Sequence, residues 1–280
     1  MSLLRQRMLE DMRIRNMSPR TQECYIWQIT KFAKHFNKSP EELGIEEIRQ
    51  YQLYLVERKT SWSVFNQTVA ALRFLYLTTL QKEWKVEQIP FPKQPKRLPV
   101  ILSVGEVSQL LKVVRDYRYR VILTTIYGCG LRLLEGTQLK INDIDSSRMV
   151  VRIEQGKGKK DRYVMLSEKL LEMLRLYFKT VRPSGIYLFP SNQNRDKPVH
   201  ESGVQRAFQK ALKTLGWKKQ VSVRTLRHCF ATHLLEAGMN LKTIQELMGH
   251  NSLETTQIYL HISRSSIQNL SSPLDLLTDF

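Results

Sequence analysis

The stretch RMVVRIEQGKGKKDRYVML, residues 148–166, decides the fold class because its pattern differs from that of the chain on both sides. Two short runs rich in Val, Ile and Tyr flank a Gly-Lys-Gly-Lys-Lys-Asp turn at 156–161. This arrangement is typical of a β-hairpin. Helical periodicity precedes the stretch and returns from Ser167 to Ile262. We therefore predict a mixed α+β domain over residues 103–264, mainly helical, with a small antiparallel β-sheet.

Residues 90–102, which precede that domain, contain four prolines interleaved with basic residues. Such a segment is extended and semi-rigid, and we interpret it as a basic linker between two domains. Residues 1–89 read as helices throughout, with short connections. Ser18 before Pro19, for example, predicts the start of a helix with one apolar face formed by Tyr25, Ile29, Phe32 and Phe36. The chain is thus predicted to be mainly α, with an N-terminal helical bundle of three or four helices.

The charge balance indicates an anionic partner. The 280 residues carry 44 Lys and Arg against 26 Asp and Glu, a formal net charge of +18. Because basic proteins gain affinity by releasing counterions from phosphates, nucleic acid is the first partner to consider, and an anionic membrane surface is a distant alternative. No apolar run approaches the ~20 residues of a membrane-spanning helix. The N-terminus also lacks the apolar core of a signal peptide, so we expect a soluble, cytoplasmic protein.

Cysteine and histidine patterns predict neither a disulfide framework nor a metal site. Cys24, Cys129 and Cys229 are far apart and without CxxC spacing, and reduced cysteines suit the cytosol. The six histidines include no HExxH, and none stands at metal-binding spacing beside a carboxylate. We therefore expect no metal and no cofactor.

Two segments near the predicted hairpin place basic residues beside glycines. In GCGLRLLE, residues 128–135, Arg132 follows a glycine pair, and Glu135 lies one helical turn later, where its carboxylate can orient the guanidinium. Lys157 stands between two glycines at the hairpin tip, where a backbone can approach a ligand closely. Each segment alone is also compatible with an ordinary ion pair or a solvent-exposed basic turn.

Two further segments lie toward the C-terminus. In VSVRTLRHCFATHLLEAG, residues 221–238, Arg224 and Arg227 fall in the first turns of a predicted helix, where the helix dipole is already positive. Three residues apart, they can grip the oxygens of one phosphate. In LMGHNSLETTQIYLHI, residues 247–262, His250 follows a helix-ending glycine, and Tyr259 is predicted inside the next helix. By themselves, a lone histidine and a helical tyrosine are usually structural.

Together, these residues suit phosphoryl transfer without a metal. A phenol has an ordinary pKa near ~10, so it needs positive neighbours to act as a nucleophile. Arginines can neutralise the non-bridging oxygens of the transition state, as a metal does elsewhere. The lysine can protonate the departing 5′ oxygen. A covalent tyrosine–phosphate bond conserves the bond energy, so that strands can be rejoined without ATP.

The four segments, in this order and spacing, resemble the signature blocks of the tyrosine recombinases, the phage-integrase family, and most of all its Xer-type and integron-integrase-like members. The resemblance covers essentially the whole chain, since family members join a helical, SAM-like core-binding domain to a C-terminal catalytic domain through a basic linker. It implies a site-specific DNA recombinase that acts through a 3′-phosphotyrosine. It assigns phosphate activation to Arg132 and Arg227, the general acid to Lys157, a phosphate contact to His250 and the nucleophile to Tyr259.

One position departs from the family pattern. The family usually has a histidine three residues before the second arginine, and this chain has Arg224 there. An arginine can bind phosphate but is a poor proton acceptor, because its pKa exceeds ~12. The proton of Tyr259 is then left to His250, to His228 or to water. His228 and His233 match the residues that follow in the family and are interpreted as structural or supporting residues.

The resemblance also implies partners. We expect double-stranded DNA with specific half-sites, a dimer on each site and a tetramer in the synapse. The tail, residues 265–280, is apolar after a Ser/Pro break and is predicted to dock on a neighbouring protomer, although packing within its own chain is an alternative.

Two other functions stay open. The first is a DNA-binding architectural or regulatory protein of the same fold with weak catalysis, which Arg224 favours. The second is a relaxase similar to type IB topoisomerases, which would share the chemistry.

Overall fold

The structure is a computed structural model and describes residues 2–82, 98–154 and 161–260. The chain divides into two compact units, Met1–Lys96 and Arg97–Phe280. Each unit has a hydrophobic core of its own. The predicted linker falls mostly outside the described residues, as do the hairpin tip with Lys157 and the tail at 265–280.

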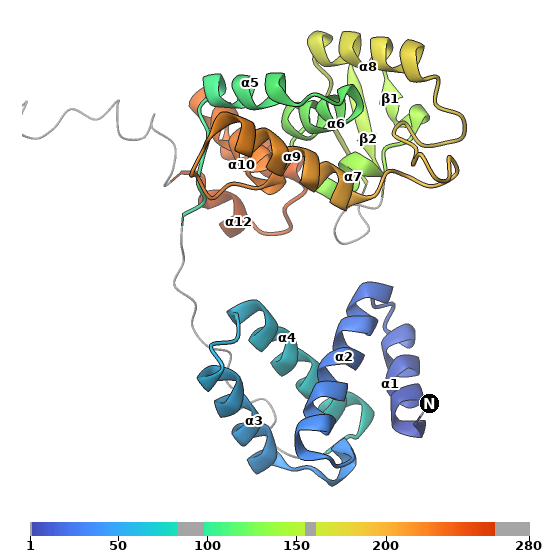
Figure 1. Cartoon of the computed structure of the whole chain (residues 1–280), viewed down its shortest axis with the longest axis vertical. Coiled ribbons are helices and arrows are strands. Elements are labelled where there is room, and N and C mark those ends of the chain that lie inside the picture. Colours follow the sequence, from blue (N-terminus) through green and yellow to red (C-terminus); the bar gives the residue numbers. More distant parts are fainter. Residues whose placement is uncertain (1, 83–97, 155–160, 261–280) are drawn as a thin grey trace, which may run out of the picture. The chain divides into compact units, whose positions relative to one another are not determined.

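The first unit is a bundle of helices (Figure 1). Its elements are α1 (Leu3–Ile14), α2 (Pro19–Phe36), the 3-10 turn η1 (Pro40–Glu42), α3 (Ile45–Glu57), α4 (Trp62–Arg73) and the π-helical turn η2 (Phe74–Thr79). As predicted, α2 begins at Pro19, and the Ser18 hydroxyl caps it by accepting a hydrogen bond from the backbone N–H of Thr21 at 3.2 Å. Apolar residues at helical spacing, among them Phe32 and Leu72, form the core.

The second unit contains the predicted hairpin within an antiparallel sheet of order β1-β2-β3 (Figure 1). The strands are β1 (Ile144–Asp145), β2 (Val150–Ile153) and β3 (Arg162–Met165). Val151 pairs with Val164, and both are buried, whereas the next pair, Arg152 and Tyr163, is exposed. This alternation places one face of the sheet on the core of the unit. The mixed α+β prediction is confirmed.

Helices form most of the second unit and pack against the buried face of the sheet. They are α5 (Val104–Val113), α6 (Tyr117–Gly128), α7 (Leu133–Thr137), α8 (Glu168–Val181), α9 (Glu201–Leu215), α10 (Val223–Glu236), α11 (Leu241–Met248) and α12 (Glu254–Gln257), with a 3-10 turn η4 (Ile141–Asp143). The central helix α6 packs against α8, α9 and α10, and α11 contacts β3. These contacts bring together α7, α10, α11 and β3, which are distant in the sequence.

The prediction of continuous helical periodicity from Ser167 to Ile262 is wrong in two places. Residues 182–200 form irregular structure between α8 and α9. This segment contains three prolines, which cannot continue a helix, and its chain is fixed instead by isolated bridges between loop residues. The last helix, α12, ends at Gln257, so that Tyr259 lies in the turn that follows and not inside a helix.

Candidate active site

Five of the six predicted site residues line one cavity of about 750 Å³ in the second unit. Arg132 stands at the start of α7, Arg224 and Arg227 project from α10, His250 follows α11, and Tyr259 follows α12. The sixth, Lys157, lies outside the described residues. Three of these five side chains carry positive charge, so the cavity is a candidate anion site.

A close approach between Gly130 and α10 shapes the wall of this cavity. Gly130 lies in the turn between α6 and α7 with φ of 61°, and a Cβ atom there would be 2.3 Å from the Phe230 ring. Glycine fits this position because it adopts a positive φ readily and has no Cβ atom to meet the ring. As a result, the Gly130 carbonyl can accept a hydrogen bond of 2.6 Å from Nη1 of Arg227.

Arg227 is the most firmly held of the arginines. It is 5% exposed, and besides the Gly130 carbonyl its guanidinium donates to the Met248 carbonyl at the end of α11. Burial lowers the pKa of Arg227 to about 9, and the charges of Arg132 and Arg162 act in the same direction, while Glu135 opposes them. The guanidinium therefore stays charged at neutral pH while its position is fixed by two backbone carbonyls.

Glu135 connects three arginines, two of which, Arg132 and Arg227, line the cavity. Its carboxylate accepts a hydrogen bond of 2.6 Å from Arg132 and two from Arg162, of 3.1 and 2.7 Å, and it lies 3.8 Å from Arg227. Burial alone raises the pKa of Glu135, but the hydrogen bonds and charge of Arg162, followed by those of Arg132, lower it to about 2. The predicted pairing of Arg132 with Glu135 is therefore present, and it belongs to a larger network.

Arg162 is the member of this network that sequence reasoning missed. It starts β3, and its side chain is only 9% exposed. Besides its forked contact with Glu135, its Nε donates to the Leu247 carbonyl of α11 at 2.9 Å. The alternation of buried and exposed residues along the strand gave a weak indication that Arg162 faces inward, because it pairs with the buried Ile153. Its acidic partner, however, could not be read from the sequence.

The candidate nucleophile Tyr259 is 1% exposed, and its hydroxyl is 3.0 Å from Nδ1 of His228. Burial raises the pKa of the Tyr259 phenol, and the charges of Arg227, Arg224 and Arg132 offset part of that rise. His250 stacks on the Tyr259 ring with 12° between the ring planes, and its Nδ1 is 2.9 Å from the Thr256 hydroxyl. Both aromatic neighbours thus hold the tyrosine in place.

Both histidines of the cavity are neutral at physiological pH. Burial is the main cause that lowers the pKa of His228 to about 4, with the charges of Arg224 and Arg227 adding to it. Burial likewise lowers the pKa of His250 to about 4, assisted by Arg227 and Arg132. An uncharged imidazole can accept a proton, so each histidine is chemically able to act as a base.

Comparison with known proteins identifies the relatives of this chain. Residues 101–266 match the Phage integrase family, and residues 4–86 match the phage integrase N-terminal SAM-like domain. A putative integrase/recombinase of Sinorhizobium fredii, y4qK, is 50% identical over 99% of this chain and 90% of its own length. A tyrosine recombinase of Pseudothermotoga lettingae is 35% identical over 90% of each chain. The chain belongs to the phage integrase family.

As a member of this family, the chain is a tyrosine-type site-specific recombinase. Its fold matches that of the Tn1549 transposon integrase, solved in complex with circular intermediate DNA, with a TM-score of 0.73 at 18% identity, over 95% of this chain and 97% of that one. Within the described residues, the recombinase has no group of three or more potential metal-ligating side chains. The same part of the chain contains no helix long and apolar enough to cross a membrane.

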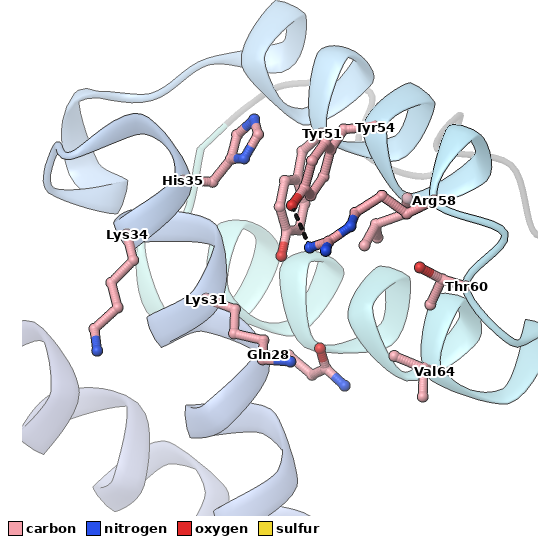
Figure 2. Close-up of a pocket in the computed structure, with 10 residues that line it drawn as sticks. Gln28, Lys31, Lys34, His35, Tyr51, Tyr54, Arg58, Thr60 and Val64 are labelled. Carbon is pink, nitrogen blue, oxygen red and sulfur yellow. Dashed lines mark hydrogen bonds between the residues drawn. The ribbon is translucent and has the colours of Figure 1, made fainter.

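The SAM-like domain of the recombinase carries a second cavity, of about 560 Å³, lined by α2, α3 and the start of α4 (Figure 2). Its wall combines Lys31, Lys34 and Arg58 with aromatic rings. Nη1 of Arg58 donates to the Tyr54 hydroxyl at 2.7 Å, and the ring of His35 lies 4.3 Å from that of Tyr54, centroid to centroid. Basic and aromatic side chains together are typical of nucleic-acid surfaces.

Proposed function

We propose that this recombinase cuts and rejoins DNA through a covalent bond between Tyr259 and a 3′ phosphate, without metal or ATP. The observation that carries the proposal is that a buried tyrosine and three arginines, Arg132, Arg224 and Arg227, line the same cavity. A phosphodiester placed there would have its charge neutralised by guanidiniums that are already positioned. The phosphotyrosine would conserve the energy of the broken bond, so that rejoining needs no external energy source.

Each group in the cavity has a role in this chemistry. Arg132 and Arg227 would neutralise the non-bridging oxygens, Arg224 would add a contact from its exposed position at the cavity edge, and His250 would bond the scissile phosphate. Lys157, from the hairpin tip outside the described residues, would protonate the departing 5′ oxygen.

Double-stranded DNA with specific half-sites is the proposed substrate. The net charge of +18 and the basic, aromatic cavity of the SAM-like domain support contacts to the phosphate backbone from both units. Recombining two duplexes requires four strand cuts, and each chain supplies one Tyr259, so a dimer on each site and a tetramer in the synapse would complete the reaction. The tail at 265–280 would link neighbouring protomers.

The test traps the covalent intermediate. A duplex that the protein binds is first selected from a random-sequence pool, and one strand is nicked close to the centre of the bound site. A cut beside the nick releases a short fragment that diffuses away, so the strand cannot be rejoined and the adduct accumulates. We expect a protein–DNA adduct that survives denaturation, forms in the presence of EDTA and without nucleotide, and is absent from Tyr259→Phe. An adduct formed by Tyr259→Phe would show that another residue is the nucleophile.

The alternatives are separated in the same assay. A wild-type protein that binds the selected duplex but forms no adduct would be the architectural or regulatory DNA-binding protein that Arg224 favours. Relaxation of supercoiled DNA lacking the selected site, without exchange between two sites, would indicate the relaxase similar to type IB topoisomerases.

A further inference from the structure

We propose that His228 is a catalytic residue, the base that takes the proton from Tyr259 when this tyrosine attacks DNA. This inference rests on the proposed function, which did not say which group removes the proton from Tyr259. The decisive contact is the 3.0 Å distance between Nδ1 of His228 and the Tyr259 hydroxyl, which is within hydrogen-bond reach of the proton to be removed.

The other candidate bases are less well placed. Nδ1 of His250 is bonded to the Thr256 hydroxyl, and its ring lies parallel to that of Tyr259 at 6.5 Å between centroids, so that it stacks on the phenol. Arg224 stands where the family has a histidine, but a guanidinium does not accept protons near neutral pH. Residues four apart on a helix share a face, so His228 projects from the same side of α10 as Arg224. The helix therefore carries an imidazole one turn further along.

The surroundings of His228 keep its imidazole unprotonated at neutral pH. The charged and titratable groups that face it in the described part of the chain are Arg224 and Arg227 on its own helix, His250 after α11 and Tyr259 after α12. Burial and the two arginines hold the pKa of His228 near 4, so the imidazole is neutral at pH 7. Accepting from the phenol requires the proton of that neutral ring to be on Nε2.

The step balances without any further reactant. The Tyr259 oxygen forms a bond to the scissile phosphorus while its proton moves to Nδ1 of His228, giving an imidazolium. The bond from phosphorus to the 5′ oxygen breaks, and that oxygen takes a proton from the general acid. In the rejoining step the 5′ hydroxyl attacks the phosphotyrosine and returns its proton to the general acid. The bond from phosphorus to the Tyr259 oxygen breaks, and the imidazolium returns its proton to that oxygen. No proton is gained or lost over the complete cycle.

The test uses His228→Asn in the full chain with the nicked, selected duplex. Asparagine can still hydrogen-bond the Tyr259 hydroxyl from about the position of Nδ1 but does not accept a proton. We expect the rate of adduct formation at pH 7 to fall by about 100-fold or more, because general-base catalysis contributes 10²–10⁴-fold. The variant rate should then rise about tenfold per pH unit, since solvent must remove the proton, while the wild-type rate stays nearly level between about pH 6.5 and 8.5.

His200→Asn is the matched control, because His200 caps α9 outside the cavity and asparagine is an equally good N-cap. A His228→Asn rate close to that of wild type at pH 7 would overturn the proposal. A reduced rate with the level pH profile of wild type would also overturn it, since His228 would then only position Tyr259. Failure of the proposed function gives a different result, in which wild type forms no adduct or Tyr259→Phe still forms one.

Discussion

At the scale of single residues, the site depends on how Glu135 holds three arginines close together. Like charges on largely buried side chains repel one another strongly. The Glu135 carboxylate lies within 3.8 Å of Arg132, Arg162 and Arg227, and it stays ionised because its pKa is about 2. The guanidiniums are therefore fixed before any substrate arrives. A preorganised positive charge of this kind favours a transition state that gains negative charge.

Arg224 provides the first prediction at this scale. We expect Arg224→His to slow adduct formation by about 10- to 100-fold, because the exposed guanidinium would contribute a charge-assisted contact to the phosphate, worth roughly 1.5–3 kcal/mol, that a neutral imidazole does not replace. Arg224→Lys should retain more of the rate, since it keeps the charge. The measurement is single-turnover trapping on the nicked duplex. A gain in rate with histidine would instead mean that the arginine weakens catalysis.

Sequence reasoning found the site residues that stand in motifs and missed the contacts between distant segments. Arg132, Arg227, His250 and Tyr259 could be named because the segments that contain them resemble, in order and spacing, the signature blocks of a known family, and the structure places them around one cavity. The contacts of Arg162 with Glu135 and of His228 with Tyr259 span 27 and 31 residues. These contacts depend on how the hairpin, α7, α10 and the last turn pack together, which local periodicity does not encode.

At the scale of elements, the turn between α6 and α7 sets how closely α10 can approach. We expect Gly130→Ala to lower the free energy of unfolding by about 3 kcal/mol, because the new methyl group meets the Phe230 ring at 2.3 Å and the backbone φ of 61° is unfavourable for alanine. Gly216→Ala is the matched control. Its φ of 65° is similar, but no atom lies within 4 Å of the added carbon, so only the backbone cost of about 1 kcal/mol remains.

Urea unfolding of both glycine variants measures this difference. Equal decreases in stability in the two proteins would show that Phe230 moves aside easily and that the close approach does not constrain α10.

Predictions of whole elements succeeded where one repeating pattern dominated. The hairpin was recognised from β-branched runs around a glycine-containing turn, and α2 from its serine cap and apolar face. The error at residues 182–200 arose because the helical periodicity on both sides was extended across Pro183, Pro190 and Pro198, which are signals that a helix stops. A helix was also predicted at α12, but it ends at Gln257, so that Tyr259 lies beyond it.

At the scale of the whole molecule, positive charge is distributed over both units. Lys31, Lys34 and Arg58 surround the cavity of the SAM-like domain, while the arginines described above line the cavity of the second unit. A protein that binds a duplex through two such units gains affinity from many phosphates at once, and each neutralised phosphate releases counterions. Affinity for DNA of any sequence should therefore depend steeply on salt.

We expect the affinity for a random-sequence duplex to fall by about 10³-fold or more between about 50 and 200 mM salt. Replacing Lys31, Lys34 and Arg58 together by Gln should reduce the slope of log affinity against log salt by about 1 for each phosphate that the variant no longer neutralises.

The control replaces Arg175 and Lys179, exposed residues of α8, which lies far from α12 in Figure 1. Fluorescence anisotropy measures all three proteins. An unchanged slope in the triple variant would exclude this cavity from DNA binding.

The burial of Tyr259 has a consequence for the safety of the cell's own DNA. A side chain that is 1% exposed cannot be reached by a duplex that merely collides with the protein. If Tyr259 is the nucleophile, accidental breakage is limited by how often this residue is uncovered, and not by how often protein and chromosome meet. Strong electrostatic attraction to any sequence, which the net charge of +18 makes unavoidable, then carries little risk of unwanted cuts.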